Sequence, residues 1–136
     1  MLLIKTKLGP SKIHGIGLFA DQFVAKNIPI WKFKRGFDLK YSETELSQLA
    51  EPASDQFLHY CCSYTDETGC HYVVCADDYR FLNHSVNPNI INIEVAGEEE
   101  GVDVALKDIQ IGEELVSDCR EFDEDCAKDI EAGLKP

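Results

Sequence analysis

Residues Arg80 to Asn89 read R-F-L-N-H-S-V-N-P-N, and the segment Gly112 to Leu115, G-E-E-L, begins 23 positions after Asn89. The first stretch sets a polar run, Asn83-His84-Ser85, directly after the apolar pair Phe81-Leu82. It ends in Asn87-Pro88-Asn89, a strong turn signal. A polar run in this position is more typical of a binding site than of a hydrophobic core.

The surroundings of Asn83 and His84 separate a binding site from a simpler alternative. The segment Tyr72 to Ala76 predicts a buried strand, so both polar residues lie just beyond a strand end. A helix cap or a satisfied turn amide would also explain an isolated Asn-His-Ser triplet. Gly15-Ile16-Gly17 favours the binding site, because glycine lets the backbone approach a ligand closely. A third glycine and a βαβ pattern are missing, which excludes dinucleotide and P-loop sites.

Three elements in this order resemble those of the SET-domain family of protein-lysine methyltransferases, over roughly Ile4 to Phe122. Ser11 to Ala20 (S-K-I-H-G-I-G-L-F-A) resembles the family's opening glycine motif. Arg80 to Asn89 resembles its R-F-x-N-H-S-C-x-P-N element. Asp108 to Cys119 (D-I-Q-I-G-E-E-L-V-S-D-C) resembles its closing D-I-x-x-G-E-E-L-x-x-D-Y. Two further stretches, Ile30 to Phe33 and Arg120 to Asp123, are similar to small free-standing members of bacterial type.

The expected fold is mainly β: the SET-domain (β-clip) fold, with short strands in small sheets, a knot-like C-terminal threading and one or two short helices. We assign residues 1–122 to the SET domain and 123–136 to an acidic tail that could form a short helix. Ser42 to Glu45 is a capping box that opens a helix ending before Pro52, and Ser54 to Tyr60 predicts further helix. The expected strands are Leu2–Ile4, Leu18–Ala20, Ile28–Phe33, Tyr72–Ala76, Ile90–Val95, Val102–Leu106 and Leu115–Val116.

The resemblance implies that S-adenosylmethionine (SAM) is the cofactor. The peptide groups of Gly15 to Leu18 would cradle it, Asn83 would bind its amino-acid portion, and His84 would meet the adenine through backbone atoms. Glu114 would be structural. The expected cofactor-binding residues are His14, Gly15, Ile16, Gly17, Leu18, Arg80, Phe81, Asn83 and His84.

Two positions depart from the family pattern. Val86 stands at the usual cysteine, and Cys119 stands at the family's catalytic tyrosine. Cysteine is shorter than tyrosine and its S–H is a weak donor, so we expect slowed rather than abolished transfer. The candidate catalytic residues are therefore Cys119 together with Tyr72 and Tyr79, and Tyr60 is a further tyrosine that could supply a hydroxyl. The alternative is a non-catalytic module that binds SAM or a peptide.

Charge is distributed unevenly along the chain. Residues 1–40 carry eight Lys or Arg against Asp21 and Asp38, a net of +6, while the other 96 residues carry five basic and 23 acidic ones. The acidic part would repel phosphate backbones, so we expect no direct nucleic-acid binding. A lysine-rich protein or peptide is the expected substrate. The turn Glu98 to Glu100, between Gly97 and Gly101, predicts an exposed hairpin loop.

Six cysteines show no C-x-x-C pair, and we expect them to be reduced and without metal. No apolar run approaches the ~18 residues that a membrane span needs, and no signal peptide is evident, so we expect a cytoplasmic protein. The tail lacks the cysteine-rich zinc cluster of larger SET enzymes. The outer wall of the substrate channel would then come from the segment around Phe122 or from a second copy of the chain, as a homodimer.

Overall fold

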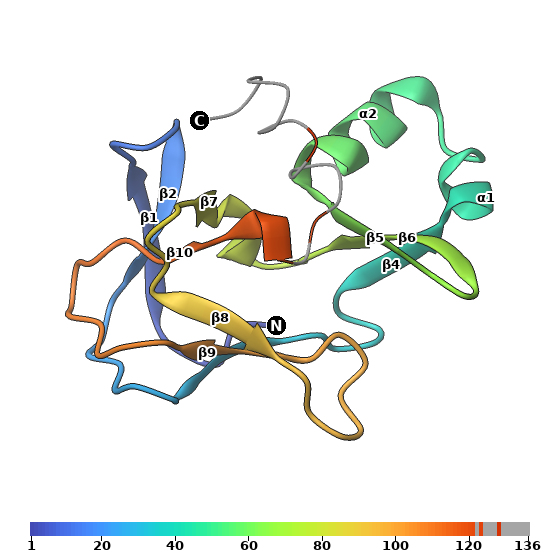
Figure 1. The fold of residues 1–136 in the computed structure, drawn as a ribbon. Helices are drawn as coiled ribbons and strands as arrows, with labels where there is room; N and C mark the ends of the chain where they lie inside the picture. Colours follow the sequence, from blue (N-terminus) through green and yellow to red (C-terminus); the bar gives the residue numbers. More distant parts are fainter. Residues whose placement is uncertain (122, 124–127, 129–136) are drawn as a thin grey trace.

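The computed structural model describes residues 1–121, 123 and 128, and these form small sheets around one core (Figure 1). Most of the regular structure is strand. The elements in chain order are β1 (Thr6–Pro10), β2 (Ile16–Ala20), β3 (Pro29–Lys32), β4 (Leu39–Ser42), α1 (Glu43–Leu46), α2 (Glu51–Tyr60), β5 (Cys62–Asp66), β6 (Gly69–Val74), the 3₁₀ helix η1 (Asp78–Phe81), β7 (Asn83–His84), β8 (Ile90–Ile93), β9 (Val102–Ala105), β10 (Val116–Ser117) and the 3₁₀ helix η2 (Cys119–Glu121).

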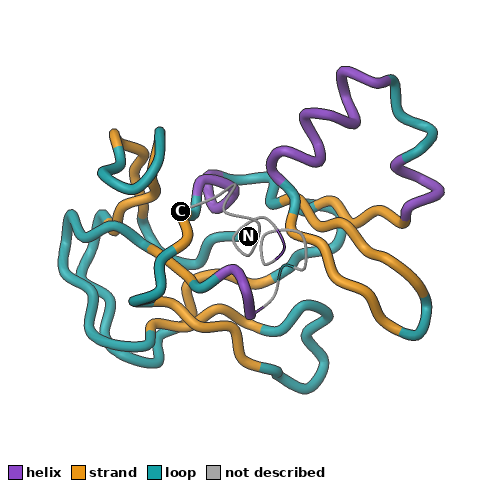
Figure 2. The backbone as a smooth tube through the Cα atoms, turned by 45° about the horizontal axis from the view of Figure 1, so that its top comes forward, coloured by secondary structure: helices purple, strands orange, loops and turns teal. Residues whose placement is uncertain are grey.

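The sheets pair strands that lie far apart in the sequence. β1 and β2 form an antiparallel hairpin, β9 lies between β3 and β8, and β6 lies between β4 and β5. The fourth sheet is the parallel pair of β7 and β10, in which Asn83 faces Val116 and His84 faces Ser117. Figure 2 shows the two α-helices on one side of the β4–β6–β5 sheet, away from the other sheets.

One apolar cluster holds the sheets together. It collects side chains from β2, β3, β6, η1, β8, β9 and the closing segment, so every sheet except the β7–β10 pair contributes a member. Fully buried members include Leu18, Ile30, Ile90, Ile109 and Leu115. Burial of side chains of this size contributes roughly 1.5–3 kcal/mol each. The prediction of a mainly β chain with short strands in small sheets is confirmed.

Local predictions differ from the structure at several places. Leu2–Ile4 is not a strand: Leu2 makes an isolated bridge to Trp31, and the first strand begins at Thr6. β1, β4, β5 and β7 were not predicted. The second helix begins at Glu51, with Pro52 in its first turn, because the missing N–H of proline costs nothing there. The capping box at Ser42 and Glu45 is present as predicted.

The acidic turn Glu98 to Glu100 joins β8 to β9 but is less exposed than predicted. Its three carboxylates bond to Lys32, Arg35 and Lys40 at 2.7, 2.7 and 2.6 Å, and the Glu100 side chain is only 12% exposed. Cations from residues 32–40 therefore draw this turn onto the body of the domain. The predicted helix in the tail lies outside the described residues. Among those residues no helix is long and apolar enough to cross a bilayer.

The β7–β10 pair is secured by the buried side chain of Asn89. Its Nδ2 donates to the Glu114 carbonyl at 2.8 Å and to Glu113 Oε1 at 3.2 Å, and its Oδ1 accepts from the Val116 N–H at 2.9 Å. The residue is 2% exposed, so water cannot replace these bonds. Asn89 thereby ties the segment after β7 to the closing segment.

We predict that Asn89→Ala lowers the free energy of unfolding by about 2–4 kcal/mol, because it leaves several buried backbone groups without partners. Urea unfolding monitored by circular dichroism measures the change. Asn87→Ala, at an exposed position in the same turn, is the matched control and should change stability by less than about 0.5 kcal/mol. Equal losses in the two variants would contradict the role given to Asn89.

Candidate functional site

A groove of about 1530 Å³ brings together segments from both ends of the chain. The β1–β2 turn, the C-terminal end of α2, and the η1–β7 segment border it. The closing segment after β10 and the β8–β9 turn complete its wall. The predicted site residues that line it are His14, Gly15, Ile16, Tyr79, Arg80, Phe81, Asn83, His84 and Cys119.

Asn83 connects the glycine motif to the closing segment. Its Nδ2 lies 3.2 Å from the His14 carbonyl, 3.3 Å from the Ile16 carbonyl and 2.9 Å from Glu114 Oε1. Three oxygens around one nitrogen fix the orientation of the amide. The Asn83 Oδ1 has no bonded partner among the residues that the structure describes. It is left as an acceptor for a ligand, such as the ammonium of an amino acid.

Gly17 is required by the position of Glu114. A Cβ at Gly17 would lie 2.3 Å from Glu114 Oε1, the atom that accepts from Asn83. Gly17 itself is buried behind the groove, and Leu18 belongs to the core. The structure therefore does not bring these two predicted cofactor residues to the groove surface. Gly15, at a positive φ of 48°, makes the turn that exposes His14 to Ile16.

The His84 ring is engaged by the closing segment. Its Nδ1 accepts the Cys119 N–H at 3.3 Å, which places the proton of the neutral ring on Nε2. Asp118 Oδ1 also lies 3.6 Å from Nδ1. The carboxylate of Asp118, however, is already bonded to Arg120, which holds the pKa of that carboxyl below its usual value. The ring thus works as a fixed acceptor that positions the Cys119 backbone.

The sulfur of Cys119 is buried and lies 3.4 Å from His84 Nδ1. It is part of a disulfide bond, so the prediction that the cysteines are reduced is wrong at this position. A disulfide sulfur has no S–H, and it therefore offers neither a donor nor a nucleophile. Cys62, Cys70 and Cys75 are free thiols. Burial raises the pKa of the Cys62 and Cys75 thiols, which makes both poor nucleophiles.

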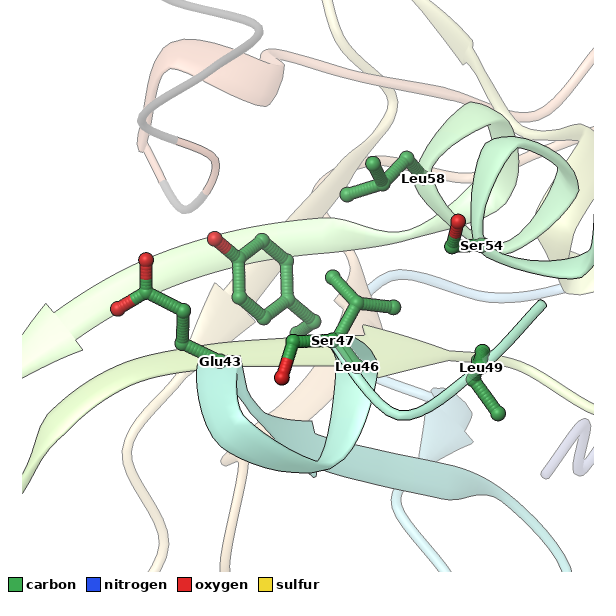
Figure 3. Close-up of a pocket in the computed structure, with 7 residues that line it drawn as sticks. Glu43, Leu46, Ser47, Leu49, Ser54 and Leu58 are labelled. Atoms are coloured by element: carbon green, nitrogen blue, oxygen red, sulfur yellow. The ribbon is translucent and has the colours of Figure 1, made fainter. Parts of the chain in front are cut away.

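The two tyrosines predicted as catalytic lie in different places. Tyr79 is buried in the groove wall, stacks on Trp31 with ring centroids 5.3 Å apart, and donates to Asp103 Oδ2 at 2.7 Å. Its hydroxyl is thus engaged, and burial followed by the Asp103 charge raises its pKa. Tyr72 is not brought to the groove. It lines a separate hollow of about 290 Å³ between α1 and α2, together with Leu46 and Leu58 (Figure 3).

Tyr60, at the end of α2, is a further tyrosine that lines the groove. It packs edge-on against Phe81 at 5.7 Å, and the Arg80 guanidinium lies 5.9 Å from its ring centroid. Its hydroxyl has no bonded partner among the described residues. Its packing against Phe81 is a tertiary contact that local sequence patterns do not encode. The described residues contain no group of three or more potential metal ligands.

The SET-domain family model matches residues 15–120 of this chain. The chain belongs to the SET-domain family. Its fold is similar to that of a proposed histone methyltransferase from Plasmodium falciparum, with a TM-score of 0.54 and 18% identity over 85% of this chain and 92% of that one.

Two further structures share the SET fold. The CpSET8 protein of Cryptosporidium has a TM-score of 0.58 and 19% identity, over 84% of this chain and 56% of that one. The other is a chain of a humanized mutant of Chaetomium thermophilum Polycomb Repressive Complex 2 bound to an inhibitor. Its TM-score is 0.66 and its sequence identity 20%, over 92% of this chain and 16% of that one. The match therefore covers only a small part of the Chaetomium thermophilum chain.

We predict that Gly17→Ala lowers the free energy of unfolding by about 1–3 kcal/mol, because the new methyl must push Glu114 away from Asn83. Chemical unfolding of the single and double mutants measures this. In a Glu114→Ala background the same change should cost clearly less, since the clashing carboxylate is absent. An equal cost in both backgrounds would assign the loss to another neighbour, such as Ser11.

Proposed function

We propose that this protein is a SAM-dependent protein-lysine N-methyltransferase that acts on a basic protein or peptide. The observation that carries the proposal is the meeting of three separate segments at one groove: the glycine turn, Asn83 and the closing segment. Asn83 bonds to the first and to Glu114 of the third. Membership of the SET-domain family supports the same function.

The groove suits SAM at its glycine end. Asn83 Oδ1 is an unoccupied acceptor, as the ammonium of the cofactor's amino-acid portion requires. The exposed backbone of His14 to Ile16 and the β7 backbone at His84 supply further polar groups. When bound, the cofactor supplies a methyl group on a positively charged sulfur. The residues described here would bind and orient it, and the lysine amine must approach that methyl in line.

The target lysine must lose its proton, since the reference pKa of its amine is ~10.4. Tyr60 and Phe81 line an apolar part of the groove, where burial lowers the pKa of an amine. The Arg80 guanidinium lies 5.4 Å from the Phe81 ring centroid, and a nearby like charge shifts that pKa in the same direction. The Tyr60 hydroxyl is positioned to accept or donate a hydrogen bond at the amine.

A second function is favoured by one specific observation. Cys119 stands where the family has its tyrosine, and its sulfur forms a disulfide bond. A non-catalytic module that binds SAM or a basic peptide would tolerate this change. Transfer of a radiolabelled methyl group from SAM to a panel of basic proteins separates the two functions, because only the enzyme labels a substrate.

We predict that Asn83→Ala lowers SAM affinity at least about tenfold, because it removes both the ligand acceptor and the bonds that hold the glycine turn. Isothermal titration calorimetry gives the dissociation constant. The exposed Asn87→Ala variant is the control and should bind as the wild type does. Unchanged affinity in a folded Asn83→Ala variant would refute this cofactor site.

We predict that Cys119→Tyr raises the rate of methyl transfer by about 10- to 100-fold, because it restores one preorganised hydroxyl donor. Single-turnover transfer is measured beside Cys119→Phe, which removes the disulfide and adds the same ring without the hydroxyl. The wild type is assayed with and without a thiol reductant to isolate the effect of the disulfide. Equal rates in the Tyr and Phe variants would show that this hydroxyl does not limit the reaction.

A further inference from the structure

The far end of the groove, away from the glycine turn, is dominated by the acidic turn between β8 and β9. Gly97 and Gly101 flank this turn with positive φ values of 88° and 69°, which lets it reverse sharply. Its three carboxylates line the groove, whereas the cations that bond them do not. Lys32, Arg35 and Lys40 therefore approach the glutamates from outside the groove and leave the inner side open.

Two of these carboxylates keep bonding capacity for a ligand. Glu98 bonds Lys32 through Oε1, and Glu100 bonds Lys40 and Tyr64 through Oε1. In the part of the chain that the structure describes, neither Oε2 atom has a partner. An ionised carboxylate accepts at about four lone-pair positions, so each can take a second cation. The ion pairs with Lys32 and Lys40, taken alone, are explained equally well by stabilisation of the turn as by a ligand site.

Trp31 supplies an independent indication of a ligand. Its side chain lines the same groove and is 5% exposed, and its indole Nε1–H has no hydrogen-bond partner in the described structure. In the β3–β9 ladder Trp31 pairs with Asp103, two residues beyond the end of the acidic turn at Gly101. A buried donor without an acceptor is unfavourable unless a ligand or water completes it. A peptide carbonyl is an acceptor that matches the indole.

We propose that Trp31, Glu98 and Glu100 form an acidic subsite for a second basic residue of the peptide substrate, distinct from the lysine that is methylated. This inference rests on the proposed function and narrows its substrate class to peptides with two basic side chains. The second ammonium or guanidinium binds Glu98 and Glu100, and the peptide backbone accepts from the indole. These two needs are met by one short segment of a basic peptide.

Lys40 is the internal competitor for this subsite. Its Nζ lies 2.6 Å from Glu100 Oε1 and 2.7 Å from the Tyr64 hydroxyl, and 5.3 Å from the Tyr64 ring centroid. Burial favours loss of the proton, but the hydrogen bonds to Glu100 and Tyr64 outweigh it and raise the pKa of Lys40. The lysine is thus fully charged at neutral pH. An entering basic side chain must share Glu100 with it, which weakens binding.

The test uses the full chain and two sets of fluorescein-labelled eleven-residue peptides of alanine, glycine and serine. One set carries a single lysine, and the other adds an arginine two to six positions away on either side. Fluorescence anisotropy gives the dissociation constants at low and high salt. We expect the best two-charge peptide to bind about fivefold more tightly than its one-charge counterpart, and this preference to shrink at high salt.

Five variants locate the preference on the protein. Glu98→Gln and Glu100→Gln should each reduce it about threefold, whereas Glu67→Gln, the same change in the exposed β5–β6 turn, should leave it intact. Trp31→Phe keeps a ring but removes the donor, and it should weaken both peptide sets about equally. Lys40→Gln should strengthen binding of the two-charge peptide severalfold, because the competitor is gone.

Arg35→Gln covers the case in which Lys40→Gln fails to fold. Its side chain is 80% exposed and, among the described residues, bonds only Glu99, so its removal should raise two-charge binding slightly without affecting stability. Equal binding of the two peptide sets, or equal effects of Glu100→Gln and Glu67→Gln, would overturn the subsite. Retained methyl transfer to any single-lysine peptide in that case would leave the proposed function standing.

Discussion

The hydrogen bonds of the Asn83 side chain are the interaction on which the site depends. One amide nitrogen joins the turn after β1, the strand β7 and the segment before β10, three parts of the chain that are otherwise separate in sequence. Glu114 can occupy its position only because Gly17 has no side chain. One structural unit is therefore formed by Gly17, the Asn83 amide and the Glu114 carboxylate, each from a different motif. This unit holds together the three segments that form the groove.

Electrostatics organise the rest of the molecule around this unit. Three of the eight cations in the first forty residues, at positions 32, 35 and 40, hold the acidic turn. The groove consequently keeps an acidic far end and a single guanidinium, Arg80, at the aromatic part of its wall. These charges are the ones that the proposed function requires: an acidic end for the basic peptide, and a positive charge where the target amine must lose its proton.

The sequence predicted the family, the fold class and the residues that meet at the groove, because each motif combines special backbone needs with a particular side chain. It did not predict β4 and β5, because these strands lack a strong alternation of apolar and polar residues. Both are stabilised by pairing with β6. It misplaced Tyr72, since a one-residue step along a strand turns a side chain to the other face. The disulfide at Cys119 and the ion pairs of the acidic turn are tertiary features that local patterns do not encode.

The parallel pairing of β7 with β10 also bears on how the chain folds. Parallel strands cannot be joined by a tight turn, and here 31 residues separate His84 from Val116. Contacts of this kind form slowly, because the chain must lose the entropy of closing a long loop before the strand pairing stabilises it. A growing chain that has not yet reached Ser117 and Cys119 therefore lacks part of the groove wall, so the groove cannot form before the closing segment is synthesised.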